Sequence, residues 1–165
     1  MRHVEWSNRF SVGITELDAQ HARIIELLND MAEAAASPED GSRLRAVLSG
    51  LKAHAAAHFS AEEAVVGQVA PELLTFHQGE HLKFLSRVRE FTLALDADAH
   101  PPMLPLEMFH FLKSWFEDHI LGVDMQYAAR LRHGFDEAHE PATGTDSGPS
   151  RSEERRAGKE CRSRW

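Results

Sequence analysis

The chain has 165 residues, of which 42% are hydrophobic and 27% charged, and its formal net charge is -8. This length and composition predict one soluble domain that buries its own core. The acidic surplus argues against a nucleic-acid partner, because phosphates would repel it, and no run of residues is long and apolar enough to span a membrane. The amino terminus lacks an apolar signal core, and the single cysteine, Cys161, excludes an internal disulfide and a thiolate metal site. We therefore expect a cytoplasmic protein with neither nucleic acid nor a membrane as a partner.

The first predicted helix covers residues 18–36 and opens at Asp18, a favourable N-cap residue. Its inward positions recur at helical spacing: Leu17, His21, Ile24, Leu28, Met31 and Ala35. The preceding residues, 1–17, form an arm that we expect to pack across the helices through Trp6, Phe10 and Ile14.

Three more helices follow, over about residues 42–66, 72–95 and 105–132. Gly67 is expected to close the second helix, and Pro105 suits the first turn of the fourth. Each helix carries an apolar stripe with the period that favours nearly parallel packing, and the short connections make consecutive helices antiparallel. The predicted fold class is all-α, an up-down-up-down four-helix bundle with an N-terminal arm and a disordered C-terminal tail.

The domain prediction places the bundle at residues 1–134 and a flexible tail at residues 135–165. From about Glu140 the chain is rich in Gly, Pro, Ser, Thr and charge, a composition that is typical of disorder. The final RSEERRAGKECRSRW shares nothing with the patterning of the body, and we expect this tail not to be native.

Eleven histidines are the anomaly of the composition, and several lie on the apolar stripes. Starts of odd helices and ends of even helices meet at one end of an antiparallel bundle, which places seven potential metal ligands at one level. They are His21, His58, Glu62, His77, His81, His119 and Asp124. Two of the helices each carry an i,i+4 pair of these residues, which stacks on one helix face.

A single histidine on an apolar stripe is more often a hydrogen-bonded core residue than a ligand. Glu62 is harder to explain in that way, because a buried carboxylate without a partner cation is costly. Asp124 lies five residues after His119, about 140° away on an ideal helix. Either Gly122 permits a local distortion or Asp124 reaches sideways. Two further histidines fall off the stripes: we expect His54 to be solvated or to contact a ligand, and His110 to face away.

The stretches SVGITELDAQH (11–21), HFSAEE (58–63), HQGEH (77–81) and HFLKSWFEDHILGVD (110–124), in this order, resemble the hemerythrin family, in particular its single-domain bacterial members. The resemblance covers roughly residues 5–130. It implies two iron ions: His77, His81 and His119 would bind one ion, and His21 and His58 the other. Glu62 and Asp124 would bridge both ions together with a solvent-derived oxo or hydroxo group.

This implied ligand set leaves one octahedral position open, on the iron with two histidines, where dioxygen could bind. Five residues are candidates by helical phase to line a dry pocket there: Ile24, Ile25, Leu28, Trp115 and Phe116. Family members commonly carry leucine at the position of Phe116, so this pocket is where the chain departs from the pattern.

The resulting expectation is reversible dioxygen binding at a non-haem di-iron centre, for oxygen storage, transport or delivery, by a monomer that is not an enzyme. Three alternatives stay open. The same centre could sense oxygen, nitric oxide or redox state for a partner protein, or it could consume peroxide or nitric oxide as an enzyme. A bundle with zinc or mixed metals would instead have a structural role.

Overall fold

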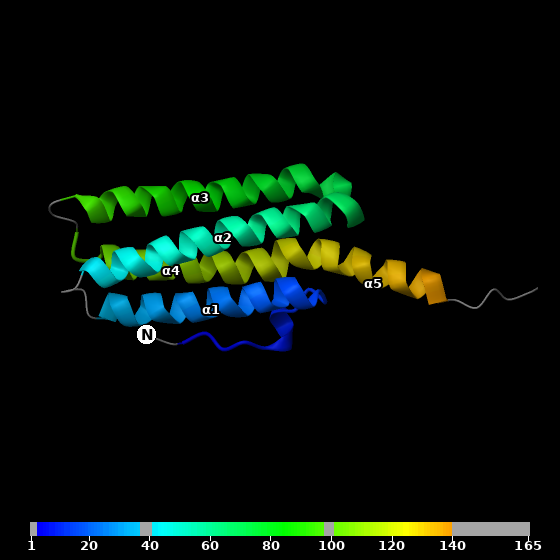
Figure 1. Ribbon diagram of the computed structural model, residues 1–165, viewed down its shortest axis with the longest axis horizontal. Helices are drawn as coiled ribbons and strands as arrows, with labels where there is room; N and C mark the ends of the chain where they lie inside the picture. The colour runs from blue at the N-terminus through cyan, green and yellow to red at the C-terminus, as the bar shows by residue number, and fades with distance from the viewer. Residues whose placement is uncertain (1–2, 37–40, 98–100, 140–165) are drawn as a thin grey trace, which may run out of the picture.

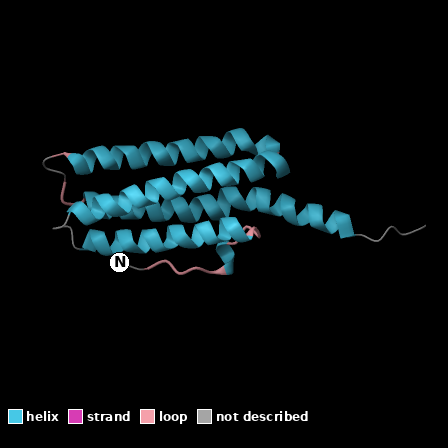
Figure 2. Ribbon diagram, viewed as in Figure 1, coloured by secondary structure: helices cyan, strands magenta, loops and turns pink. Residues whose placement is uncertain are grey.

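The computed structural model describes residues 3–36, 41–97 and 101–139. Its main helices are α1 (Thr15–Ala36), α2 (Gly41–Val69), α3 (Leu74–Asp96), α4 (Leu104–Asp118) and α5 (Met125–His139). A π-helical segment, η3 (His119–Asp124), joins α4 to α5 so that they form one continuous rod (Figure 1). Two 3₁₀ turns, η1 (Asn8–Phe10) and η2 (Pro71–Leu73), precede α1 and α3. The described residues form no β-strand (Figure 2), and the predicted all-α four-helix bundle is confirmed.

The apolar stripes hold the bundle together. Helix α1 packs against α2 and α4, and α3 packs against α2 and α4. Predicted stripe residues such as Leu28, Leu48 and Leu112 are almost completely buried. Near two helix ends the buried position moves by one residue, so that Ala34 and Val66 are buried. At Val66 the shift follows from the α-helical period of about 3.6 residues, which moves the buried position to later residues than a 3.5-residue repeat does.

Several predicted helix limits were wrong by a few residues. Helix α1 begins at Thr15, so Asp18 lies in its first turn and is not the N-cap. Helix α2 continues through Gly67 to Val69, because glycine is tolerated within a helix where packing supports it. The third helical region starts with a 3₁₀ turn, and the fourth ends at His139.

The N-terminal arm packs across the bundle, as expected. The side-chain amide of Asn29 binds the backbone of Val4 twice, because its oxygen accepts from the Val4 N–H and its nitrogen donates to the Val4 carbonyl, each at 2.9 Å. The Asp18 carboxylate accepts from the Val12 N–H at 2.8 Å. Phe10 is fully buried, whereas Trp6 remains 38% exposed. Asp18 therefore holds the arm and does not cap the helix.

The core has two apolar parts along the bundle axis. The larger part includes Leu28, Phe59 and Phe116, and the smaller part includes Leu17 and Val66. Of the seven buried polar or charged residues described, five lie in the chain between residues of the two parts, and His58 and His119 lie at the edge of the larger part, beside Phe59 and Ile120. The bundle therefore encloses a polar layer between two apolar ones.

No helix among the described residues has the length and apolarity needed to cross a membrane. Residues 140–165 lie outside the described residues, so the predicted boundary at residue 134 and the flexible, non-native tail stay predictions.

Two glycine-to-alanine substitutions should change stability in opposite directions. Gly13 has a φ of 86°, which alanine adopts only with strain, so Gly13→Ala should lower the free energy of unfolding by about 1 kcal/mol. Gly79 lies within α3, and a methyl group there would meet nothing within 4 Å. Gly79→Ala should therefore raise the free energy of unfolding by about 0.5–1 kcal/mol. Urea unfolding of the metal-free variants measures both changes. If both substitutions changed the free energy of unfolding in the same direction, either the positive φ of Gly13 or the open helical position of Gly79 would be contradicted.

Candidate metal centre

The structure brings all seven predicted residues into one buried cluster. Helix α1 supplies His21, α2 supplies His58 and Glu62, α3 supplies His77 and His81, and η3 supplies His119 and Asp124. Each residue is at most 4% exposed. The antiparallel topology thus brings the helices together at one level, as the sequence indicated.

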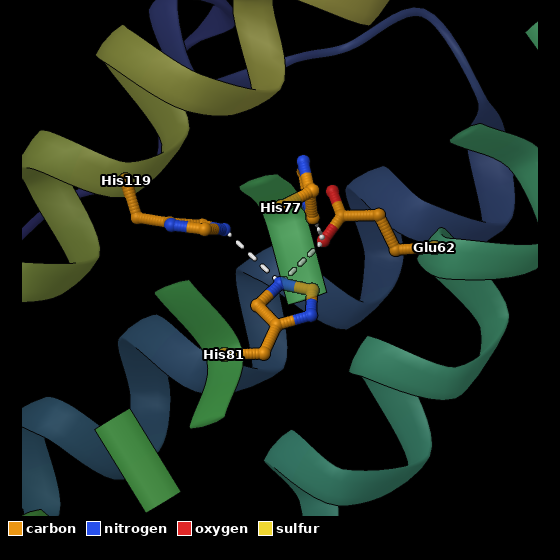
Figure 3. A group of neighbouring side chains, drawn as sticks. All are labelled: Glu62, His77, His81 and His119. Carbon is orange, nitrogen blue, oxygen red and sulfur yellow. Dashed lines mark hydrogen bonds and ion pairs between the residues drawn. The ribbon is translucent and has the colours of Figure 1, made fainter. Parts of the chain in front are cut away.

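The first group of candidate ligands is Glu62, His77, His81 and His119, whose ligand atoms all lie within 4.8 Å of one another (Figure 3). Glu62 Oε2 lies 3.1 Å from His77 Nε2 and 3.3 Å from His81 Nε2. The Nε2 atoms of His81 and His119 are 3.1 Å apart. Such spacings suit atoms that share one coordination shell with metal–ligand bonds of about 2.1 Å.

The second group is His21, His58 and Glu62, which meet the same distance limit. His58 Nε2 lies 3.6 Å from Glu62 Oε2. Since this oxygen also faces His77 and His81, Glu62 belongs to both groups through a single atom.

Asp124 lies between the two groups as well. Its Oδ1 is 3.1 Å from His119 Nε2, and its Oδ2 is 3.6 Å from His21 Nε2. Its two oxygens thus face different groups of histidines. This is the arrangement that a carboxylate needs to span two ions.

The π-helical segment explains why Asp124 shares a face with His119. In a π-helix the hydrogen bonds run from residue i to i+5, so five residues complete about one turn. The predicted phase difference of about 140° applies to an α-helix and therefore does not arise here. Gly122 lies within the segment without a positive φ, and a methyl group on it would meet nothing within 4 Å. Of the two explanations left open by the sequence, a local distortion is the correct one, although Gly122 shows no steric need for glycine.

Hydrogen bonds on the outer side of the cluster fix the tautomers of three histidines. A carbonyl or carboxylate oxygen can only accept, so the ring nitrogen that faces it must carry the proton. His21 Nδ1 donates to the Phe10 carbonyl at 3.2 Å. His58 Nδ1 donates to Gln20 Oε1 at 2.9 Å, and His81 Nδ1 donates to Glu63 Oε1 at 2.8 Å. The Nε2 atom of each ring therefore directs a lone pair into the cluster.

Burial keeps several of these histidines neutral. Loss of solvent lowers the pKa of His58 from 6.5 to about 3 and that of His119 from 6.5 to about 2. Burial also lowers the pKa of His21, although the Glu62 charge opposes this. At neutral pH these rings are uncharged nitrogen donors, the form that binds a metal ion.

The two carboxylates share one buried site and titrate as a pair. Burial alone would raise the pKa of Glu62, but the surrounding histidines, chiefly His77 through its 3.1 Å hydrogen bond, outweigh it and hold this pKa well below its usual range. Burial and the charge of Glu62 raise the pKa of Asp124 well above its usual range. Among the described residues, no Lys or Arg forms an ion pair with either carboxylate, so a bound cation would supply the missing charge.

Unpaired polar atoms show the same need for a cation. His21 Nε2 and both Asp124 oxygens are fully buried and have no hydrogen-bond partner. Such atoms are rare in folded proteins and call for a specific explanation. Imidazole nitrogen and carboxylate oxygen together are a donor set that iron accepts. The residues present therefore fit a pair of iron ions.

Aromatic rings cover the first group on its apolar side. The Phe59 ring stacks on His81 with centroids 3.7 Å apart, and the Trp115 ring stacks on His119 at 4.2 Å. Beyond these rings lies an apolar cavity of about 10 Å³, roughly the room for one water-sized molecule. It is lined by Ile24, Leu28, Leu51, Ala55, Phe59, Phe84, Leu112, Trp115 and Phe116. Four of the five residues expected from the sequence line this cavity, and Ile25 does not. None of the seven candidate ligands lines it, so the pocket expected at the open iron position stays a prediction.

Among the residues that contact the cluster, Gln20, Glu63 and Tyr127 were not expected from the sequence. Tyr127 is buried and donates its hydroxyl to Glu62 Oε1 at 2.7 Å. Burial, and then the charge of Glu62, raises the pKa of this hydroxyl, so it stays a donor. Tyr127 follows Asp124 by three residues, and this helical neighbour spacing was the available signal.

The two off-stripe histidines lie outside both groups of candidate ligands. His110 is exposed. His54 is half-buried and donates from Nε2 to the Gln20 carbonyl at 3.1 Å, so it contacts the residue that holds His58.

Comparison with known proteins identifies the family. Residues 12–131 match the hemerythrin HHE cation binding domain. A bacteriohemerythrin from Clostridium acetobutylicum is 27% identical over 125 residues, which cover 74% of this chain and 96% of that protein. A hemerythrin-like protein from Naegleria gruberi is 30% identical over 126 residues, which cover 76% of this chain and 92% of that protein.

Solved structures agree on the fold. A wild-type hemerythrin crystal structure superimposes with a TM-score of 0.68 at 22% identity, covering 79% of this chain and 98% of that one. The crystal structure of a hemerythrin point mutant gives a TM-score of 0.69 at 22% identity, with the same coverage. The hemerythrin domain binds a di-iron centre, and the buried histidine and carboxylate cluster of this chain is able to hold metal. The chain belongs to the hemerythrin family.

Proposed function

We propose that the seven clustered residues hold the two iron ions and that the loaded protein binds dioxygen reversibly, as a store or carrier and not as an enzyme. In this assignment His77, His81 and His119 bind one ion, and His21 and His58 bind the other. Glu62 and Asp124 contact both ions. The observation that carries the proposal is that the Nε2 atoms of all five histidines face these two carboxylates inside a buried layer.

The imidazoles and the carboxylates contribute differently to binding the ions. The buried neutral imidazoles donate lone pairs without adding charge, and the two carboxylates offset part of the charge of the ions. When bound, two ferrous ions can together lend electrons to dioxygen and recover them when the gas leaves. Tyr127 holds one oxygen of Glu62, so the other stays directed at the histidines.

The surroundings of the cluster favour release of an unchanged gas over further reaction. The cavity next to the stacked rings is lined by aliphatic and aromatic side chains alone. None of these side chains can supply a proton, which a multi-step reduction of dioxygen would require. Phe116 fills part of this space, and its ring centroid lies 6.2 Å from that of His21. We propose that this cavity admits dioxygen and that Phe116 limits its size.

We propose in addition that the protein is a monomer. Within the part of the chain whose burial is described, the exposed large apolar side chains are spread over several elements: Trp6, Phe76, Leu82, Leu93, Met103 and Leu121. A stable dimer would need a contiguous patch.

The decisive experiment measures iron per chain together with the visible spectrum, recorded anaerobically after reduction, then in air, then after removal of oxygen. Two irons per chain and a charge-transfer band that appears with oxygen and disappears reversibly are expected. A centre that oxidises once and does not return would favour a redox sensor. Sustained oxygen or peroxide consumption with an electron donor would show an enzyme.

The ligand assignment predicts different results for two residues on α2. Glu62→Ala removes the carboxylate that faces both histidine groups and should lower iron binding by about 10- to 100-fold or more. His54→Ala removes a side chain outside both groups and should leave two irons per chain. Metal analysis after dialysis measures both. If His54→Ala emptied the site while Glu62→Ala did not, the wrong residues on α2 would have been assigned.

Without iron, the protein should lose stability in acid. The folded state holds the pKa of His58 at about 3 and that of His119 at about 2, both below the ordinary value of 6.5. The unfolded chain therefore takes up protons below pH 6.5 that these folded rings reject, so stability falls as the pH falls from 6.5 toward 3. Each such group contributes on the order of 1 kcal/mol per pH unit. The raised pKa of Asp124 has the opposite effect, because the folded state takes up this proton at a higher pH than the unfolded chain does. It offsets one of the histidine contributions.

Urea unfolding of the metal-free protein at several pH values tests this dependence. His58→Gln removes one of these groups. The slope of the free energy of unfolding against pH should then correspond to about one proton fewer taken up on unfolding. Stability that does not change between pH 7 and pH 5 would contradict the neutral, buried state of these rings.

A further inference from the structure

The outer hydrogen-bond partners of the candidate ligands differ in charge. His21 donates to the Phe10 carbonyl and His58 donates to the Gln20 side-chain amide, and both of these acceptors are neutral. His81, in the other group, donates to the Glu63 carboxylate at 2.8 Å. The described structure thus places an anionic partner behind the three-histidine group and neutral partners behind the two-histidine group.

Glu63 is fixed in this position from two sides. It lies on α2, next to Glu62, but both of its oxygens bond to α3. Oε1 accepts from His81 Nδ1 at 2.8 Å, and Oε2 accepts from Gln78 Nε2 at 3.0 Å. Its side chain is 26% exposed, so most of the carboxylate is shielded from water and its field is only partly screened.

The charge of an outer partner changes what the imidazole can donate. A hydrogen bond to a carboxylate is stronger than one to an amide oxygen, because the acceptor is ionised. It pulls the Nδ1 proton outward and makes the inward Nε2 a better electron donor to a metal ion. Better donation stabilises the more highly charged, oxidised state of the ion.

We propose that Glu63 is a positioning residue that makes the two metal positions unequal, by lowering the reduction potential of the ion held by His77, His81 and His119. This inference rests on the ligand assignment proposed above. It does not depend on whether the loaded centre releases dioxygen unchanged. Among the described residues, no carboxylate hydrogen-bonds to the outer nitrogen of His21 or His58: Gln20 supplies an amide to His58, and the charge of Asp18 acts on His21 without a hydrogen bond.

The test compares three variants of the full chain loaded with ferrous iron. Glu63→Gln keeps the shape and an acceptor oxygen but removes the charge. Gln20→Glu adds a charge behind His58. Glu80→Gln is the matched control: Glu80 precedes His81, and its carboxylate pairs with Lys83 at 2.6 Å and bonds to no candidate ligand.

The loaded centre is first oxidised with a chemical oxidant, and its reduction potential is then measured by titration with a chemical reductant through redox mediators, in which each oxidised ion gains one electron. Glu63→Gln should lower the ratio of oxidised to reduced ion at a fixed poise about tenfold, which corresponds to about 59 mV for a one-electron couple. Gln20→Glu should change the ratio in the opposite direction, and Glu80→Gln should leave it near the wild-type value. Mössbauer spectra should show one iron signal altered in Glu63→Gln and the other signal altered in Gln20→Glu.

A purely structural role for Glu63 would overturn the proposal, and three results would show it. One is a potential that Glu63→Gln shifts no more than Glu80→Gln does. Another is an equal change of both iron signals. The third is a lower melting temperature of the metal-free Glu63→Gln protein with an unchanged potential of the loaded one. A wild-type chain that holds two irons without reversible oxygen binding would refute the carrier function alone, and a chain that holds none would refute the ligand assignment.

Discussion

Two carboxylates buried in the centre of a helical bundle are the constraint on which the structure depends. Glu62 and Asp124 are completely buried, and no described Lys or Arg pairs with either. Burial of such groups costs several kcal/mol unless charge and hydrogen bonds compensate. Five surrounding histidines, mostly held neutral by burial, can compensate only in part. The apolar stripes above and below the layer must therefore stabilise a bundle whose polar centre becomes favourable when cations are present.

The same constraint accounts for the irregular backbone. A regular α-helix would carry Asp124 away from His119, and a second carboxylate would then not reach the layer. The π-helical segment over His119–Asp124 corrects the phase, after which α5 resumes regular geometry. Such segments are rare and are found frequently at functional sites. The distortion lies where the proposed ligands need it, which links the local cost of the backbone to the chemistry of the centre.

Much of the fold and cluster could be predicted because burial leaves a periodic signal. The stripe through Leu44, Leu48, His58 and Glu62 gave the inward face of α2, and helix order then placed its end beside His77. Helix limits were harder to predict from the sequence, because tertiary contacts override local signals. Asp18, for example, has the residue type of an N-cap but binds the arm instead. Glu63 and Gln20 could not be assigned from one sequence, because they contact the cluster across helices and lie off the stripes. The sequence indicated the π-helical turn only indirectly, because His119 and Asp124 would lie about 140° apart on an ideal α-helix.

The arm makes the centre depend on residues outside the long helices. Its Phe10 carbonyl fixes the ring of His21, while Asn29 and Asp18 hold the chain on either side of it. The group of two histidines therefore depends on the arm and on a neutral side-chain amide for its outer hydrogen bonds. The other is fixed by Glu63 and covered by stacked Phe59 and Trp115. Two ions in one layer would thus experience different charge and different rigidity, because only one of them is supported wholly by the long helices.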